Sequence, residues 1–120
     1  ELTHVATHAA ISDLPTWLVE GFADYVAYRD SGIPVRTAAA ELAADVRAGR
    51  LPAALPTRRD FHDDERRVRA YEEAWLACRY IAARFGEEAL VRLYRRERAL
   101  GMSVAEFTAA WREYVRGELA

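Results

Sequence analysis

Three polar residue types are missing from this chain: it has no lysine, asparagine or glutamine, and all 17 basic residues are arginine. We interpret that bias, together with abundant alanine, as the coding preference of a GC-rich bacterial genome. Cysteine is almost absent too, because Cys78 stands alone and excludes an internal disulfide framework. Its apolar neighbours, Trp75, Leu76 and Ile81, favour a buried and unreactive thiol.

Long hydrophobic runs are also lacking, and none approaches the ~20 residues that a membrane-spanning helix needs. The formal net charge of −2 gives no reason to expect nucleic acid or an anionic membrane as a partner. With 52% apolar and 30% charged residues, the 120 residues can form one packed domain. The chain has no initiator methionine, so we expect sequence upstream of it. Neither the compartment nor the oligomeric state is indicated.

Helix signals dominate, and alternating β-branched runs are absent, so the sequence predicts an all-α fold without a second domain or repeat. The expected helices span residues 1–10, 17–28, 37–48, 64–85 and 87–99, followed by one that opens at a capping box of Ser103 and Glu106. The proline-containing segment 51–64 is the longest expected loop. We interpret it as a connector rather than an active-site rim.

The first four residues match the end of a zinc-protease motif. Glu1 to His4 reads E-L-T-H, the last four letters of H-E-x-x-H. That motif places two imidazoles one helical turn apart so that they converge on one ion, and its glutamate lies beside the reacting water. Glu1 would be the general base, His4 the second imidazole ligand, and the first imidazole would precede Glu1. On its own, E-x-x-H is a weak signal.

A second histidine pair stands nearby. His4 and His8 are also four residues apart, but Val5 occupies the position where the motif carries its carboxylate. The pair therefore lacks a general base. We expect His8 to face solvent or to cap a helix rather than to act in catalysis.

The segment at residues 17–24, W-L-V-E-G-F-A-D, changes the weight of the first motif. It puts Glu20 within an apolar helical face, where a desolvated carboxylate is unfavourable unless it is paired or bound to a metal. Gly21 inside a helix costs roughly 1 kcal/mol relative to alanine, which predicts that another group approaches the backbone closely. The plainer interpretation is an exposed glutamate beside a tolerated glycine.

Together, the two segments resemble the gluzincin branch of the zincin metallopeptidases. They are most similar to the bacterial peptidase-MA-like metallohydrolases, whose pattern reads H-E-L-T-H-V and then W-L-x-E-G-x-A. The resemblance covers nearly all of the first 28 residues. It continues more weakly from Tyr71 to Gly86, as a helix behind the site, and from Phe107 to Tyr114, as a closing helix.

The resemblance implies a zinc cofactor and hydrolysis of a peptide or protein substrate. By position, His4 and Glu20 would be zinc ligands and Glu1 the catalytic base. Asp24, one turn after Glu20, would orient a ligating histidine, with a plain surface aspartate as the alternative. Tyr71 would aim its phenol at the oxyanion, although a core tyrosine is the alternative.

The implied fold is the helical C-terminal part of a zincin-like α+β metallopeptidase domain that lacks the upstream β-sheet. Two protein ligands hold zinc weakly, since such sites use three or four. We therefore expect the 120 residues alone to bind zinc poorly and to have little activity. The intact parent protein should bind zinc and be active.

The competing interpretation is a non-catalytic helical interaction module or pseudoenzyme. Its binding face would be formed by clusters of arginine, at residues 58–59, 66–67 and 92–96, which acidic neighbours largely balance. RNA binding by these clusters is a weaker third interpretation because the chain is acidic overall. His62, in the long loop, is a further candidate donor to a transition state, but we expect it to be solvated.

Overall fold

A computed structural model describes residues 14–120. The regular secondary structure in this part of the chain is helical. The seven helices in this part of the chain are Thr16–Tyr28 (α1), Val35–Ala38 (α2), Ala40–Arg47 (α3), Arg58–Phe61 (α4), Arg67–Phe85 (α5), Glu87–Tyr94 (α6) and Val104–Leu119 (α7). No strand occurs among these residues, so the all-α prediction is confirmed for them. None of these helices is long and apolar enough to cross a membrane.

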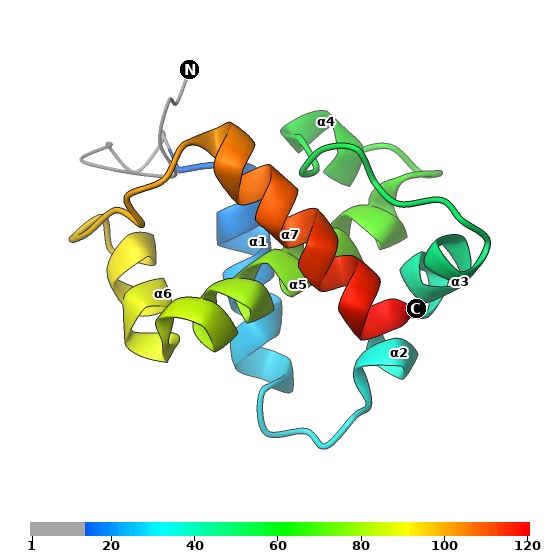
Figure 1. Cartoon of the computed structure of the whole chain (residues 1–120), viewed down its shortest axis with the longest axis horizontal. Coiled ribbons are helices and arrows are strands. Elements are labelled where there is room, and N and C mark those ends of the chain that lie inside the picture. The colour runs from blue at the N-terminus through cyan, green and yellow to red at the C-terminus, as the bar shows by residue number, and fades with distance from the viewer. Residues whose placement is uncertain (1–13) are drawn as a thin grey trace.

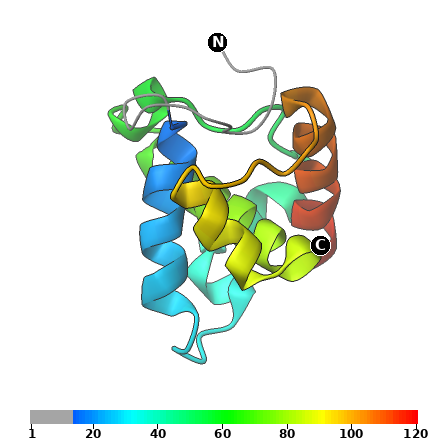
Figure 2. The ribbon, with the colours of Figure 1, turned by 90° about the vertical axis from the view of Figure 1, so that its left-hand side faces the viewer.

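The long helix α5 organises the domain, because α1, α3, α4, α6 and α7 all pack against it. Figures 1 and 2 show α1 and α7 on opposite sides of α5. Small fully buried residues along it, Ala70, Ala74 and Ala77, let neighbouring helices approach closely. Because helices pack against α5 from several sides, its buried residues do not lie on a single face. Val68, near the start of this helix, is apolar but 48% exposed.

Aromatic pairs fix α1 to its other neighbours. Trp17 stacks on Phe107 of α7 with ring centroids 5.3 Å apart, and Phe22 stacks on Tyr94 of α6 at 4.2 Å. Such pairs contribute about 1 kcal/mol each beyond the apolar area that they bury. The orientation of α1 about its own axis is therefore set from two directions, which in turn fixes where Glu20 points.

Most predicted helix ends agree with the structure where the signal is local. α5 ends at Gly86 with φ of 100°, in the left-handed region that favours glycine. The capping box that opens α7 is present, with the Ser103 hydroxyl accepting from the amide of Glu106 and the Glu106 carboxylate accepting from the amide of Ser103. The predicted helix 87–99 is shorter and ends at Tyr94, where Arg96 takes a φ of 62°.

The helix expected over residues 37–48 is interrupted at Ala39, where φ is −112° and ψ is 48°. A long-range contact explains the interruption. The Glu72 carboxylate, on α5, accepts a hydrogen bond of 2.8 Å from the amide of Leu42 in the first turn of α3. A carboxylate at that point caps the free amides of a new helix and meets the positive end of its dipole. The chain therefore restarts a helix here instead of continuing one.

Candidate functional site

The predicted site residues fall into two groups. Glu1 and His4, together with His8 and the helix expected over residues 1–10, lie outside the described residues. Glu20 and Asp24 on α1 and Tyr71 on α5 lie within them.

Glu20 and Asp24 occupy the same side of α1, one turn apart, and both are partly buried. Burial raises the pKa of the Asp24 carboxyl, and the negative charge of Glu20 raises it further. No other side chain in the described part of the chain forms a hydrogen bond or ion pair with Asp24. Two neighbouring carboxylates without a compensating cation favour a positive charge between or beside them.

Tyr71 faces this pair from α5. Burial raises the pKa of its phenol, and the charges of Glu20 and Asp24 raise it further, as does a side-chain hydrogen bond to Glu20; Arg67 opposes them. The ring itself is held edge-to-face by Phe61 of α4, with centroids 5.0 Å apart. The structure thus brings together Glu20, Asp24 and Tyr71, which the sequence separates by some fifty positions.

Close packing of two helices produces this arrangement. A Cβ atom on Gly21 would lie 2.3 Å from the carbonyl oxygen of Ala74 and 3.0 Å from Sγ of Cys78. The predicted close approach at Gly21 is therefore confirmed, and the backbone of α5 is the group that approaches. On the same contact, the Cys78 thiol lies 3.9 Å from the carbonyl oxygen of Leu18. It is fully buried, as predicted, and burial raises its pKa.

Beside Tyr71, the two helices enclose a pocket of about 260 Å³. It is lined by Asp24 and Tyr28 from α1 and by Arg67, Tyr71, Glu72 and Trp75 from α5. Sequence reasoning missed Glu72 and Trp75 as site residues. The charged pair Glu72-Glu73 interrupts the apolar run of α5 and was the available signal for a polar site at this helix.

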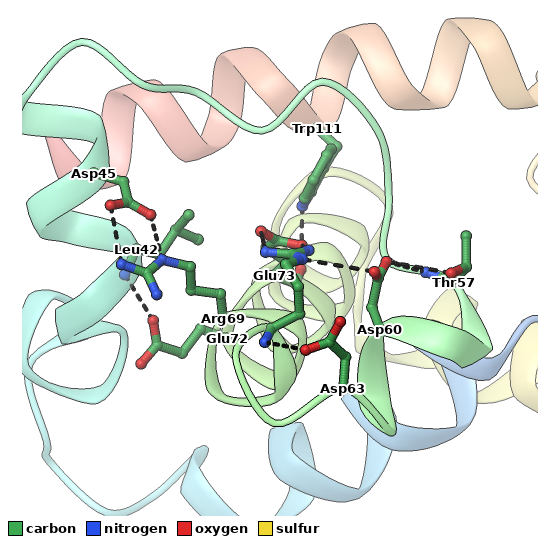
Figure 3. Close-up of polar contacts among 10 residues, drawn as sticks. Leu42, Asp45, Thr57, Asp60, Asp63, Arg69, Glu72, Glu73 and Trp111 are labelled. Atoms are coloured by element: carbon green, nitrogen blue, oxygen red, sulfur yellow. Dashed lines mark hydrogen bonds and ion pairs between the residues drawn. The ribbon is translucent and has the colours of Figure 1, made fainter.

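A second, larger cavity of about 370 Å³ lies under the loop between α3 and α4. Its wall contains Glu73, only 2% exposed, which accepts two hydrogen bonds from the Arg66 guanidinium at 2.9 and 3.2 Å. Asp60 lies 3.6 Å from the same guanidinium. Figure 3 shows these carboxylates together with Asp45 and Glu72. Through this cluster, the partly exposed Arg66 at the N-terminus of α5 connects the buried Glu73 to Asp60 of α4.

The long loop otherwise matches the connector interpretation, except that it contains the short helix α4. His62 is exposed at the end of α4, as expected.

The arginine clusters form many internal ion pairs. Arg66 binds Glu73, Arg67 pairs with Asp64, and Arg92 with Glu88 at 2.8 Å. Each of these three cations faces a carboxylate of the same chain. Those three cations add little positive field for an acidic partner such as RNA, whereas Arg58, Arg59 and Arg95 are exposed and form no ion pair within residues 14–120.

Zinc requires three or four protein ligands. Within residues 14–120, no three histidine, cysteine, aspartate or glutamate side chains come close enough to hold an ion. Glu20 fits one ligand position by its chemistry, since it is a partly buried carboxylate whose neighbours are a phenol and a second carboxylate. The remaining ligands would have to come from other residues.

Comparisons with known proteins give no information on function. No protein-family model matches this chain, and no curated protein or solved structure matches it either.

Proposed function

We propose that this chain is part of the catalytic domain of a zinc-dependent peptidase that hydrolyses peptide bonds by gluzincin chemistry. One observation carries the proposal. Glu20, Asp24 and Tyr71 were selected by motif position, and they converge across the contact between α1 and α5. Glu20 and Asp24 share a face because they are one turn apart, so the supporting observation is that Tyr71 meets both of them from α5.

In this proposal, His4 and Glu20 would hold the zinc ion together with a histidine at the position before Glu1. When bound, zinc lowers the pKa of a water molecule toward ~7 and polarises the carbonyl of the substrate. Asp24 accepts a hydrogen bond from a ligating imidazole and so fixes its tautomer and orientation. The raised pKa of Asp24 agrees with a carboxylate that needs such a donor.

Two residues act on the substrate. Glu1 takes a proton from the attacking water and later delivers it to the leaving amine. The Tyr71 phenol has one O–H, which interacts with Glu20 in the structure; with substrate bound it would donate instead to the oxygen that gains negative charge when the carbonyl is attacked. A pKa raised above its ordinary value of 10.0 keeps that phenol protonated, and therefore a donor, at neutral pH.

Zinc titration tests the metal site. Calorimetry should give weak binding by the 120 residues and stoichiometric, tight binding once the natural upstream segment is attached. Glu20→Ala in the longer protein should lose both zinc and turnover, whereas Glu1→Gln should keep zinc and lose turnover. Glu97→Ala removes an exposed carboxylate that lies outside α1 and α5, and it is the matched control. Equal zinc affinity of the Glu20 and Glu97 variants would refute the assignment.

The identity of the residue before Glu1 is an independent test of the proposed zinc site. Histidine there is what the proposal requires. Any other residue would favour the alternative of a non-catalytic helical interaction module or pseudoenzyme.

A further inference from the structure

The pocket between α1 and α5 adjoins the proposed catalytic site through Tyr71. That residue lines the pocket and also interacts with Glu20. At about 260 Å³ the pocket is smaller than the 300–1,000 Å³ typical of sites for whole small molecules. Its size suits a single long side chain, and its position suits a residue of the substrate close to the cleaved bond.

Two carboxylates from different helices face this pocket. Asp24 has no ion-pair partner among the residues that the structure describes. Glu72 uses Oε1 to accept from the amide of Leu42, which leaves its charge without a cationic side chain in direct contact. Both carboxylates are partly buried. A cation in the pocket would relieve this desolvation.

The positive groups around the pocket are already compensated. Arg67 on the rim pairs with Asp64. Arg79 lies 5.6 Å from the centroid of the Trp75 ring and 3.6 Å from the Glu118 carboxylate. Arg69, whose charge lowers the pKa of Glu72 against the larger effect of burial, pairs with Asp45 at 2.5 Å and with Glu41 at 3.0 Å. The carboxylates of Asp24 and Glu72 thus have no direct ion-pair partner among the described residues.

Aromatic rings supply the remaining wall. Tyr28 meets Trp75 edge-to-face with centroids 5.7 Å apart, and Tyr71 lies on the same side of α5. A planar guanidinium can stack on such rings and bind a carboxylate through two parallel hydrogen bonds, whereas an ammonium is a more strongly hydrated point charge. The combination of aromatic walls and two carboxylates selects arginine over lysine.

We propose that this pocket is a substrate subsite that receives an arginine side chain of the peptide, with Asp24 and Glu72 as its counter-charges and the more exposed rings of Tyr28 and Tyr71 as its stacking surface. The inference rests on the proposed peptidase function for the statement that the arginine belongs to a substrate. The binding of arginine itself does not depend on zinc.

Binding is tested on the 120 residues by NMR, with the indole N–H of Trp75 as the probe, assigned through Trp75→Phe. Nα-acetyl-arginine amide at millimolar concentrations should shift this signal, and the isosteric citrulline derivative should bind about fivefold more weakly. Asp24→Asn and Glu72→Gln should each weaken arginine binding severalfold. The glutamine retains an oxygen acceptor for the amide of Leu42, so α3 keeps its cap. Glu97→Gln should change nothing. No shift, or equal binding of arginine and citrulline, would overturn the inference.

Cleavage by the zinc-loaded longer protein separates the two proposals. Peptides that carry arginine or citrulline at each position around one scissile bond should be cut faster with arginine at one position, and Glu72→Gln should abolish that preference. Hydrolysis without the preference would overturn the subsite alone. Arginine binding without any hydrolysis would overturn both the peptidase function and the substrate role of the pocket.

Discussion

Gly21 and Ala74 mark the point where α1 and α5 touch through their backbones. A methyl group at Gly21 would come within 2.3 Å of the Ala74 carbonyl oxygen, a distance that backbone atoms cannot accommodate without moving. Gly21→Ala should therefore destabilise the protein by about 2 kcal/mol, although alanine is the better helix former. Urea denaturation followed by circular dichroism measures this change. The Gly21→Ala substitution should also move Glu20 away from Tyr71, because the contact between α1 and α5 positions both side chains.

Gly117 provides the matched control for that substitution. It lies within α7, and a Cβ atom built there meets no other atom within 4 Å. Gly117→Ala should therefore stabilise the protein by up to about 1 kcal/mol through helix propensity and the unfolded chain. If both substitutions shifted the urea midpoint in the same direction, close helix contact would not be the reason that residue 21 is glycine.

Local signals made much of the fold predictable. The glycine that ends α5 and the capping box that opens α7 act within four residues of themselves, so the sequence reveals them directly. The break at Ala39 could not be foreseen in this way. It depends on a carboxylate thirty residues away, since Glu72 caps the first turn of α3.

The candidate site was predictable only in part, for a related reason. The family resemblance predicts Glu20, Asp24 and Tyr71 as site residues, and Gly21 predicts a close contact with another backbone. Periodicity could not tell which face of α5 would meet α1, because α5 is buried on several sides. The Glu72-Glu73 pair marks α5 as carrying a polar site, but that Glu72 and Trp75 line one pocket with Asp24 is visible only in three dimensions.

Replacement of Tyr71 by phenylalanine tests the proposed role of the phenol. The ring should keep its edge-to-face contact with Phe61, so the fold should be retained. Without the hydroxyl, kcat for peptide hydrolysis by the zinc-loaded longer protein should fall by about 100-fold, since removing one oxyanion donor has an effect of this order. KM and zinc affinity should change little. Steady-state kinetics and zinc titration measure these quantities.

Tyr114→Phe is the comparison for Tyr71→Phe. This tyrosine is also partly buried and contacts Tyr80 of α5, with ring centroids 5.3 Å apart, but it lies on α7. It should leave kcat unchanged. An equal loss of kcat in both variants would point to a general effect on the fold and not to a donor at the reacting atoms.

Cys78 should report the opening of the core. The thiol is fully buried and its pKa is raised, so a disulfide reagent at pH 8 should react only when the protein opens. In that case Gly21→Ala should accelerate labelling about tenfold for each 1.4 kcal/mol of lost stability. A cysteine at the exposed position Ala109, in a Cys78→Ser background, gives the rate of a free thiol. Comparable rates at the two positions would contradict burial of Cys78.

Glu73 should make stability depend on pH in a defined direction. Burial raises its pKa above the ordinary value of 4.5, and Asp60 and Asp45 add to this, while Arg66 opposes it. The folded state therefore takes up a proton at higher pH than the unfolded state does. The stability of the natural protein relative to Glu73→Gln should increase as the pH falls from neutral toward 4.5, and should be constant below it.

Urea titrations of both proteins at several pH values measure that difference, in which the other titrating groups largely cancel. Arg66 keeps Asp60 at 3.6 Å in the variant and is 35% exposed, so its charge remains solvated and the fold should survive the substitution. Glu88→Gln, which removes an exposed glutamate from α6, is the matched control. A relative stability that declines as the pH is lowered would mean that the Arg66 ion pair outweighs desolvation, and that Glu73 holds its charge more firmly in the folded state than in the unfolded one.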